Sequence, residues 1–185
     1  MIVVNIFGGP GAGKSLNAFG LTYHLKRLGV NADFVPEYAK ELVYGEDWQT
    51  LADQSAVLDE QYRRLVRLAG KVDIAVTDGS LLLSLVYGNA LGADRFSEKD
   101  AERTRRLWRS FDNTNFLIQR SPEFGYETTG RYQDEAGANE VDRRMIDMLK
   151  AEAVGYTAVA TGRALPRMLE VLGFPQASAG GALAG

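Results

Sequence analysis

The sequence of 185 residues contains no cysteine, one histidine and only five prolines. Without cysteine there is no disulfide and no cysteine-ligated metal, and a reducing compartment is the natural expectation. The single histidine, His24, lies in a helical pattern and cannot build a histidine metal cluster. No apolar run reaches the roughly 18–20 residues that a membrane span requires. Because a strand pattern starts at Ile2, leaving no room for a signal peptide, we expect a cytoplasmic protein without a membrane partner.

Neither sign of charge dominates the composition. There are 21 basic and 24 acidic residues, which gives a net charge of −3. This balance argues against a large nucleic-acid-binding face, although a local basic groove remains compatible with it. The chain is long enough to bury a full core, so we expect one domain over residues 1–174. The small-residue segment 175–185 is predicted to be a flexible tail.

Residues 8–15 have the G-x-x-x-x-G-K-S spacing of a phosphate-binding loop. They follow an apolar run and precede a helical pattern, which is the context that this motif requires. Glycines let backbone N–H groups turn inward around phosphate oxygens, and the helix N-terminus adds a partial positive charge. Lys14 would reach the β- and γ-phosphates and the Ser15 hydroxyl would ligate Mg²⁺. The residues predicted to bind the nucleotide are Gly8, Gly9, Pro10, Gly11, Ala12, Gly13, Lys14 and Ser15.

Short apolar runs alternate with longer helical patterns along the rest of the chain. Strands are predicted at residues 2–7, 30–35, 72–77, 116–119 and 156–160. Helices are predicted at 13–28, 38–44, 50–69, 97–110, 139–151 and 165–172, with a helix or extended segment at 80–87. Five buried strands separated by helices predict an α/β fold, a parallel sheet with helices on both faces. Ligands bind such sheets at the carboxyl ends of the strands.

Two carboxylates follow predicted strands and would therefore reach that edge. Asp78 stands where the Mg²⁺-linked carboxylate of phosphate-loop proteins lies, so it would bind the metal or act as the base. Its alternative role is to cap the following helix. Glu37 would face the γ-phosphate from the acceptor side, where it could orient or deprotonate an attacking hydroxyl. Its alternative role is that of a first-turn glutamate favoured by the helix dipole.

A polar, glycine-punctuated segment, residues 121–133, follows the fourth predicted strand and is long enough to be a lid. Arg120 and Arg131 at its two ends could close on the phosphates, because phosphoryl transfer depends on positioning and on cations. The alternative is that both are solvated surface arginines.

Two further groups of polar residues lie on predicted helices. Gln54 and Gln61 are seven residues apart and share a helix face, so with the adjacent Arg63 they could read the edge of a base. A polar helix surface is the alternative. Four arginines between positions 103 and 109 follow three acidic residues, which favours a salt-bridged solvated face.

Several blocks of the chain together resemble bacteriophage P-loop kinases of the thymidylate-kinase and deoxynucleoside-kinase branch. The chain is also similar to the AAA-type kinase domain of nicotinamide riboside kinases. The resemblance extends to about Leu172 and rests on Phe7–Ser15, Glu37–Lys40, Gly70–Asp73 with Thr77-Asp78, Leu81–Ser84 and Gly130–Gln133. The phage group includes the 5-hydroxymethyluracil DNA kinases, which phosphorylate the base hydroxymethyl group within DNA during thymine hypermodification.

This resemblance implies a nucleoside- or nucleotide-kinase-like P-loop domain that uses ATP and Mg²⁺. It implies lid roles for Arg120 and Arg131, an acceptor-site role for Glu37 and the acidic third-strand position for Asp78. Deoxynucleoside kinases carry Glu-Arg-Ser after the third strand, whereas this chain has Asp78-Gly79-Ser80, which leaves open which carboxylate is the base.

The expected function is γ-phosphate transfer to a pyrimidine-nucleotide hydroxyl, foremost 5-hydroxymethyluracil in phage DNA, in the cytoplasm of an infected bacterium. Free nucleosides or nucleoside monophosphates are the alternative acceptors, which the acidic balance of charge favours. A nucleotide-dependent switch ranks below both, because the sequence has no Asn-Lys-x-Asp signature and no second domain to move. The partner is then a nucleotide or modified DNA, and the oligomeric state is left open, with a homodimer among the options.

Overall fold

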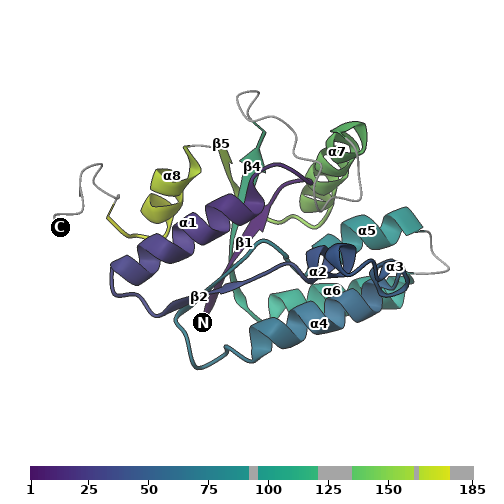
Figure 1. Cartoon of the computed structure of the whole chain (residues 1–185), viewed down its shortest axis with the longest axis horizontal. Coiled ribbons are helices and arrows are strands. Elements are labelled where there is room, and N and C mark those ends of the chain that lie inside the picture. The colour runs from purple at the N-terminus through teal and green to yellow at the C-terminus, as the bar shows by residue number, and fades with distance from the viewer. Residues whose placement is uncertain (92–95, 121–134, 161–162, 176–185) are drawn as a thin grey trace.

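The computed structural model describes residues 1–91, 96–120, 135–160 and 163–175, and these form a five-stranded sheet with helices around it (Figure 1). Neighbouring strands are parallel throughout, in the order β2-β3-β1-β4-β5. This confirms the α/β class predicted from the alternating patterns. The strands are β1 (Ile2–Phe7), β2 (Ala32–Val35), β3 (Ile74–Thr77), β4 (Asp112–Gln119) and β5 (Thr157–Ala160).

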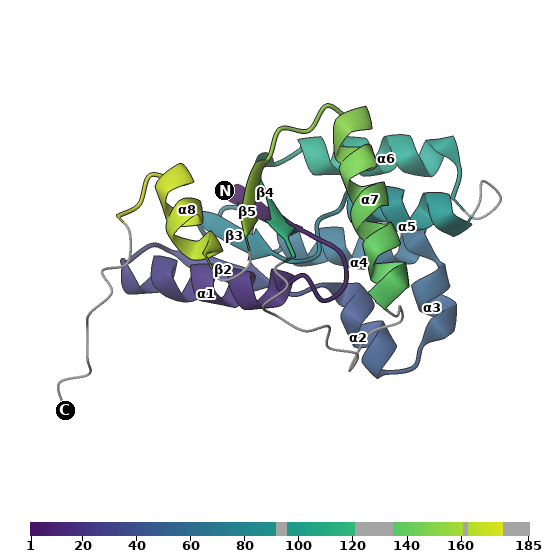
Figure 2. The ribbon, with the colours of Figure 1, turned by 90° about the horizontal axis from the view of Figure 1, so that it is seen from above.

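Helices cover both faces of the sheet, as a parallel sheet with two apolar faces requires (Figure 2). One face is covered by α1 (Lys14–Arg27) and α8 (Ala164–Val171). The opposite face is covered by α4 (Gln54–Val66), α5 (Leu83–Leu91), α6 (Glu98–Arg109) and α7 (Glu135–Ala151). The short helices α2 (Tyr38–Tyr44) and α3 (Trp48–Ala52) contact each other and α4.

The central strand β1 shows how the sequence divides the core between these layers. Its side chains alternate between the two faces because successive residues of a strand point in opposite directions. Val4 and Ile6 pack in the core on the side of α1 and α8. Phe7 packs on the other side, against α7 and α5. The strand is thus buried on both faces, and its carboxyl end leads into the loop that starts at Gly8.

Strand β4 is longer than predicted and begins at Asp112 instead of Phe116. Its first half is polar, so the pattern of apolar runs does not reveal it. The amide of Asn5 in β1 donates hydrogen bonds to Asn113, at 2.9 Å, and to Asn115, at 3.1 Å. These side-chain bonds across neighbouring strands stabilise a polar stretch inside the sheet.

The prediction of one helix over residues 50–69 is wrong. The chain breaks at Asp53, which has φ −92° and ψ 89°, and α3 and α4 lie on either side of it. The Asp53 side chain accepts hydrogen bonds from the backbone N–H groups of Ser55 and Ala56, both at 3.0 Å. An aspartate that caps a new helix in this way ends the preceding one, since it competes with the helical backbone for hydrogen bonds.

Helix α5 extends through Gly88 to Leu91, where a loop is predicted from Gly88 onward. One glycine costs a helix only about 1 kcal/mol, and the packing of an apolar helix overrides this. The predicted lid at 121–133 and the tail beyond Phe174 fall almost wholly outside the described residues. Within the described part of the chain, no helix combines the length and the apolar character needed to cross a bilayer.

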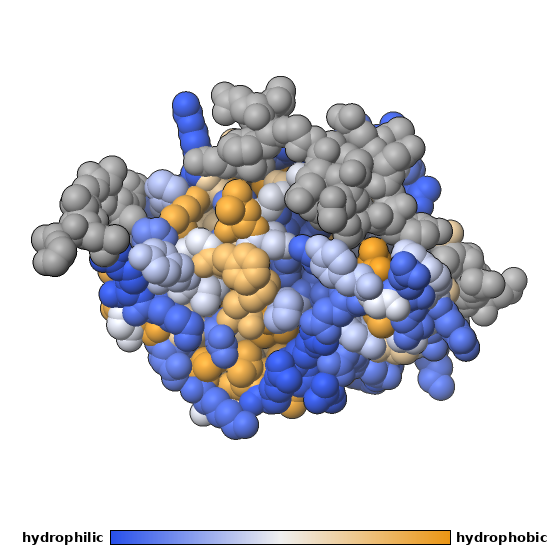
Figure 3. Space-filling model, viewed as in Figure 1, coloured by the Kyte–Doolittle hydropathy of each residue, from blue (hydrophilic) through white to orange (hydrophobic). Residues whose placement is uncertain are grey.

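An apolar band crosses the face of the molecule on which α1 and β2 lie (Figure 3). Leu16 and Phe19 in α1 are 62% and 56% exposed. The ring of Phe19 lies 4.4 Å from that of Phe34 in β2. Phe34 also packs against the core, whereas Leu16 is largely exposed and allows a surface position to be compared with a core position by mutation.

Replacing Phe116 tests the assignment of the core. Phe116 is fully buried in β4, so Phe116→Ala should lower the free energy of unfolding by about 3–5 kcal/mol through lost burial and a cavity. The exposed Leu16 serves as the control. Leu16→Ala should change the free energy of unfolding by less than about 0.5 kcal/mol. Urea denaturation followed by circular dichroism measures both. Equal losses would contradict this division between core and surface.

Candidate functional site

The loop from Gly8 to Ser15 joins the carboxyl end of β1 to the start of α1, as the motif predicts. Gly13 precedes the helix with φ 89°, a left-handed conformation that favours glycine. The Lys14 side chain is buried and its Nζ donates to the Gly9 carbonyl oxygen at 3.4 Å. The lysine therefore lies back across the loop that would surround the phosphates.

Asp78, directly after β3, connects this loop to the chain after β2. It is only 2% exposed. One carboxylate oxygen accepts a hydrogen bond from the Ser15 hydroxyl at 2.5 Å, and the other accepts one from the Glu37 backbone N–H at 2.9 Å. The three residues come together because β1, β3 and β2 are neighbours in a parallel sheet and end at the same edge.

Glu37 lies at the N-cap of α2, and its side chain faces the phosphate loop. Its Oε2 is 3.9 Å from Lys14 Nζ. The pair is largely buried, with the lysine 7% and the glutamate 18% exposed. The two residues thus form an ion pair. Its cation could hold a phosphate, and its carboxylate could receive a proton.

Helix α4 holds the segment that carries Glu37. The Gln61 amide oxygen accepts from the Tyr38 N–H at 2.9 Å. Its nitrogen donates to the Pro36 carbonyl at 3.2 Å and lies 3.4 Å from the Thr77 hydroxyl. The predicted face is thus correct, but the amide of Gln61 is engaged by the protein's own chain.

A second anchor on α4 is Arg64, one turn from Gln61. It donates to both oxygens of Glu41 at 2.6 Å and to Glu60 at 2.8 Å, and it lies over the ring of Tyr38, 4.8 Å from its centre. Hydrogen bonds from Arg63 and Arg64 lower the pKa of Glu60 to about 2, so this network stays charged at any physiological pH. It fixes α2 against α4.

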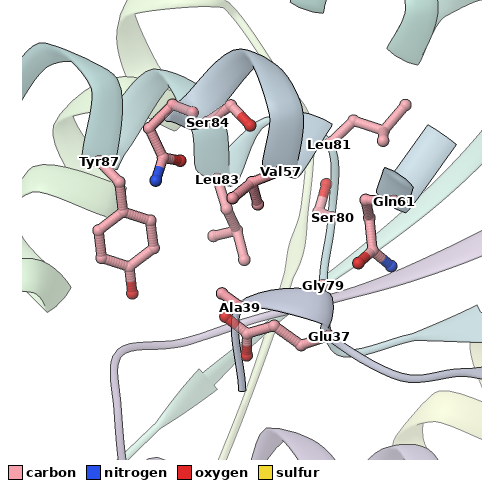
Figure 4. A pocket seen from close by; sticks show the side chains of 11 residues that line it. Glu37, Ala39, Val57, Gln61, Gly79, Ser80, Leu81, Leu83, Ser84 and Tyr87 are labelled. Carbon is pink, nitrogen blue, oxygen red and sulfur yellow. The ribbon is translucent and has the colours of Figure 1, made fainter. Parts of the chain in front are cut away.

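A cavity opens between these helices and the loop after β3 (Figure 4). Glu37 forms part of its wall, and Tyr87 reaches it from α5. The Ser80 hydroxyl is buried and has no hydrogen-bond partner among the described residues. A buried hydroxyl without a partner costs about 1–3 kcal/mol, which a bound ligand could recover. The wall is formed by Glu37, Ala39, Gln54, Val57, Gln61, Gly79, Ser80, Leu81, Leu83, Ser84 and Tyr87.

Of the three predicted substrate residues on α4, two line the cavity and one does not. Gln54 and Gln61 line the cavity. The Gln54 amide also donates to the Leu51 carbonyl at 2.9 Å. Arg63 is 65% exposed and pairs with Glu60, so it lies on the solvent side of the helix. The structure therefore does not bring Arg63 to the cavity.

Arg120, at the end of β4, reaches the phosphate loop from the other side. Its Nη2 donates to the Pro10 carbonyl at 2.6 Å, and its Nε donates to Asp142 at 2.5 Å. The predicted partner arginine, Arg131, lies outside the described residues. Asp142 was not predicted, because a single aspartate on an amphipathic helix carries no local signal that distinguishes it from a solvated residue.

The oxygens of Ser15 and Asp78 suit a magnesium ion. Hydroxyl and carboxylate oxygens are hard donors, and Mg²⁺ in nucleotide sites uses one or two protein oxygens together with phosphates and water. Among the described residues there is no group of three histidine, aspartate or glutamate side chains that could hold a metal alone. The donors of Ser15 and Asp78 therefore fit a metal that arrives with phosphates.

The fold is also that of a known nucleotide-binding protein. NadR in complex with NAD and AMP-PNP has a TM-score of 0.71 to this chain and 18% identity, covering 97% of this chain and 51% of NadR. NadR in complex with NR has a TM-score of 0.65 and 19% identity, covering 96% and 52%. The chain thus spans about half the length of the NadR chains. No curated protein matches the sequence.

The sequence profile of a family described as "AAA domain" matches residues 3–165, from β1 into α8. The match includes the phosphate loop, Glu37, Asp78, Arg120 and Asp142. Together with the parallel sheet and the loop after β1, this match shows that the chain belongs to the AAA domain family of P-loop nucleotide-binding proteins.

Proposed function

We propose that this protein is an ATP-dependent phosphotransferase that moves the γ-phosphate to a hydroxyl of a pyrimidine nucleoside or nucleotide. The observation that carries this proposal is the 3.9 Å separation between Lys14 Nζ and Glu37 Oε2. Lys14 belongs to the phosphate loop, and Glu37 belongs to the wall of the cavity. A phosphate held by the first and a hydroxyl placed beside the second would be neighbours.

Each residue then has a role that follows from its chemistry. Lys14 and the loop N–H groups hold the phosphates, and Glu37 orients the acceptor hydroxyl and takes its proton. Ser15 and Asp78 would hold Mg²⁺, which neutralises charge on the phosphate oxygens. Arg120, bound to the loop at Pro10, would stabilise the charge on the transferring group.

The cavity is the proposed acceptor site. Its wall combines apolar side chains with a few polar groups, among them the Ser80 hydroxyl, Tyr87 and Gln54, a mixture typical of small-molecule sites. The unpartnered Ser80 hydroxyl supports a ligand that brings its own hydrogen-bonding group.

The first acceptor to test is 5-hydroxymethyluracil in DNA, which the resemblance to phage kinases favours. The protein is incubated with γ-labelled ATP, Mg²⁺ and an oligonucleotide that contains this base, as a single strand and as a duplex. The same oligonucleotide with thymine is the control. Label on the modified strand alone supports the DNA acceptor, and its absence rules out that acceptor.

Free nucleosides or nucleoside monophosphates are the second candidate, and the surface charge favours them. The net charge is −3. On α6, Arg103 is paired with Asp59, and Arg105 with Glu98 and Glu152, so these arginines are engaged by carboxylates.

The same assay with thymidine, 5-hydroxymethyldeoxyuridine, their monophosphates and nicotinamide riboside tests this candidate. A steep fall of DNA binding with salt would count against it, and fast ATP hydrolysis without any acceptor would indicate a switch instead.

The roles of the two carboxylates can be separated by isosteric substitution. Glu37→Gln should lower kcat by about 10²–10⁴-fold, because it removes the proposed base, with a smaller effect on the KM for MgATP through the loss of the ion pair with Lys14. Asp78→Asn should raise the Mg²⁺ concentration required for half-maximal activity. Lys14→Ala should lower kcat/KM by at least about 100-fold.

Steady-state kinetics with a magnesium titration measures these effects. The control is Glu102→Gln, which changes an exposed carboxylate on α6. If Glu37→Gln leaves kcat within about tenfold of the parent, below the usual range for loss of a general base, then Glu37 is not the base.

Substitution of Ser80 tests the acceptor site, because it should weaken acceptor binding without lowering the stability of the protein. Ser80→Ala should leave the free energy of unfolding unchanged or raise it by up to about 1 kcal/mol, because it removes a buried hydroxyl without a partner. It should raise the KM for the acceptor by about 5–10-fold, the worth of one neutral hydrogen bond. Ser110→Ala, which alters an exposed serine bonded to Leu107, is the matched control. An unchanged acceptor KM would remove Ser80 from the site.

A further inference from the structure

Asp142, in the middle of α7, makes a bridge between the phosphate loop and Arg120. Its Oδ1 accepts from the Gly9 N–H at 2.5 Å, and its Oδ2 accepts from Arg120 Nε at 2.5 Å. Arg120 completes the ring of contacts through Nη2, which donates to the Pro10 carbonyl at 2.6 Å. One carboxylate therefore ties the loop backbone and the arginine side chain together.

The loop is shaped to receive this carboxylate. A Cβ atom placed on Gly9 would lie 2.3 Å from Asp142 Oδ1 and 2.9 Å from the carbonyl oxygen of Ala138. One turn further along α7, Met145 Sδ lies 3.1 Å from the Gly8 nitrogen. Position 9 thus lacks room for any side chain, and α7 packs directly on the backbone of the phosphate loop.

The bridge is a charged contact in a half-buried setting. Arg120 and Asp142 are 25% and 26% exposed. Hydrogen bonds in which both partners are ionised are about twice as strong as neutral ones, and water screens this pair only in part. The guanidinium is consequently held in one place before any nucleotide binds.

We propose that Asp142 is a positioning residue that holds Arg120 against the phosphate loop, where the terminal phosphate of a nucleoside triphosphate binds. This rests on the proposed function for the contact between Arg120 and a phosphate, and it does not depend on the identity of the acceptor. Arg120 is the group that touches phosphate, and Asp142 acts through it. An arginine fixed in advance binds a terminal phosphate without first losing side-chain freedom, so the bridge favours a triphosphate over a diphosphate.

Nucleotide binding tests this inference without any acceptor. Isothermal titration calorimetry with Mg²⁺ measures the Kd for AMP-PNP and for ADP in each variant. We expect the parent protein to bind AMP-PNP at least about tenfold more tightly than ADP, as a charged hydrogen bond to the extra phosphate implies. Arg120→Ala should abolish that preference. Asp142→Asn should reduce it at least about fivefold, because it removes the charge that orients the arginine.

Three further variants separate a positioning role of Asp142 from a general effect of losing a charge on α7. Asp147→Asn makes the same change at an exposed position of α7 and should leave the preference unchanged. In the Arg120→Ala background, Asp142→Asn should have no additional effect on the preference, because both act through one group. Asp142→Ala, which removes the carboxylate altogether, should mimic Asp142→Asn and provides a second route if that variant folds poorly.

The outcomes of this test and of the proposed function are distinct. Loss of the preference in Asp142→Asn together with no phosphate transfer to any acceptor would overturn the kinase and leave the role of Asp142 standing. An Asp142→Asn protein that still prefers AMP-PNP as the parent does would overturn the inference, even if transfer is observed. A parent protein without any preference, or independent effects of the two substitutions, would overturn it as well.

Discussion

The buried carboxylate of Asp78 links the two halves of the candidate site. Removing a carboxylate from water costs several kcal/mol unless its oxygens are hydrogen-bonded. Asp78 meets this requirement with the Ser15 hydroxyl on one oxygen and the Glu37 N–H on the other. The same bonds that satisfy the charge therefore fix the phosphate loop relative to the start of α2. The 3.9 Å approach of Lys14 to Glu37 lies directly beside this link.

The order of the strands gives the site two sides. Strand β1, which leads into the phosphate loop, lies between β3 and β4. On the β3 side, Asp78 bonds to Ser15 and Glu37 pairs with Lys14, and Glu37 also lines the cavity. On the β4 side, Arg120 and Asp142 bind the loop backbone at Pro10 and Gly9. In the proposed reaction, the acceptor would therefore lie on the first side of the loop and Arg120 on the second.

The sequence was sufficient to predict the parts of the site that follow from local pattern and sheet geometry. The loop motif was visible by itself, and Glu37 and Asp78 were placed beside it because parallel strands end at one edge. The break at Asp53 was missed since a capping aspartate and a mid-helix aspartate look alike in sequence. Asp142 meets Gly9 across 133 positions of chain, and no periodicity in one sequence reports such a contact.

Gln61 shows the limit of such patterns most clearly. Its spacing from Gln54 predicted the correct helix face, but spacing says nothing about the partners of an amide. A glutamine amide offers two donors and an oxygen with two lone pairs. Here the nitrogen contacts Pro36 and Thr77 and the oxygen contacts Tyr38, so one lone pair is left. With the Glu37 segment held as it is, Gln61 can offer a base only this one acceptor position. If the cavity binds the proposed acceptor, the buried Ser80 hydroxyl, which has no partner among the described residues, offers it more hydrogen-bonding capacity than Gln61 does.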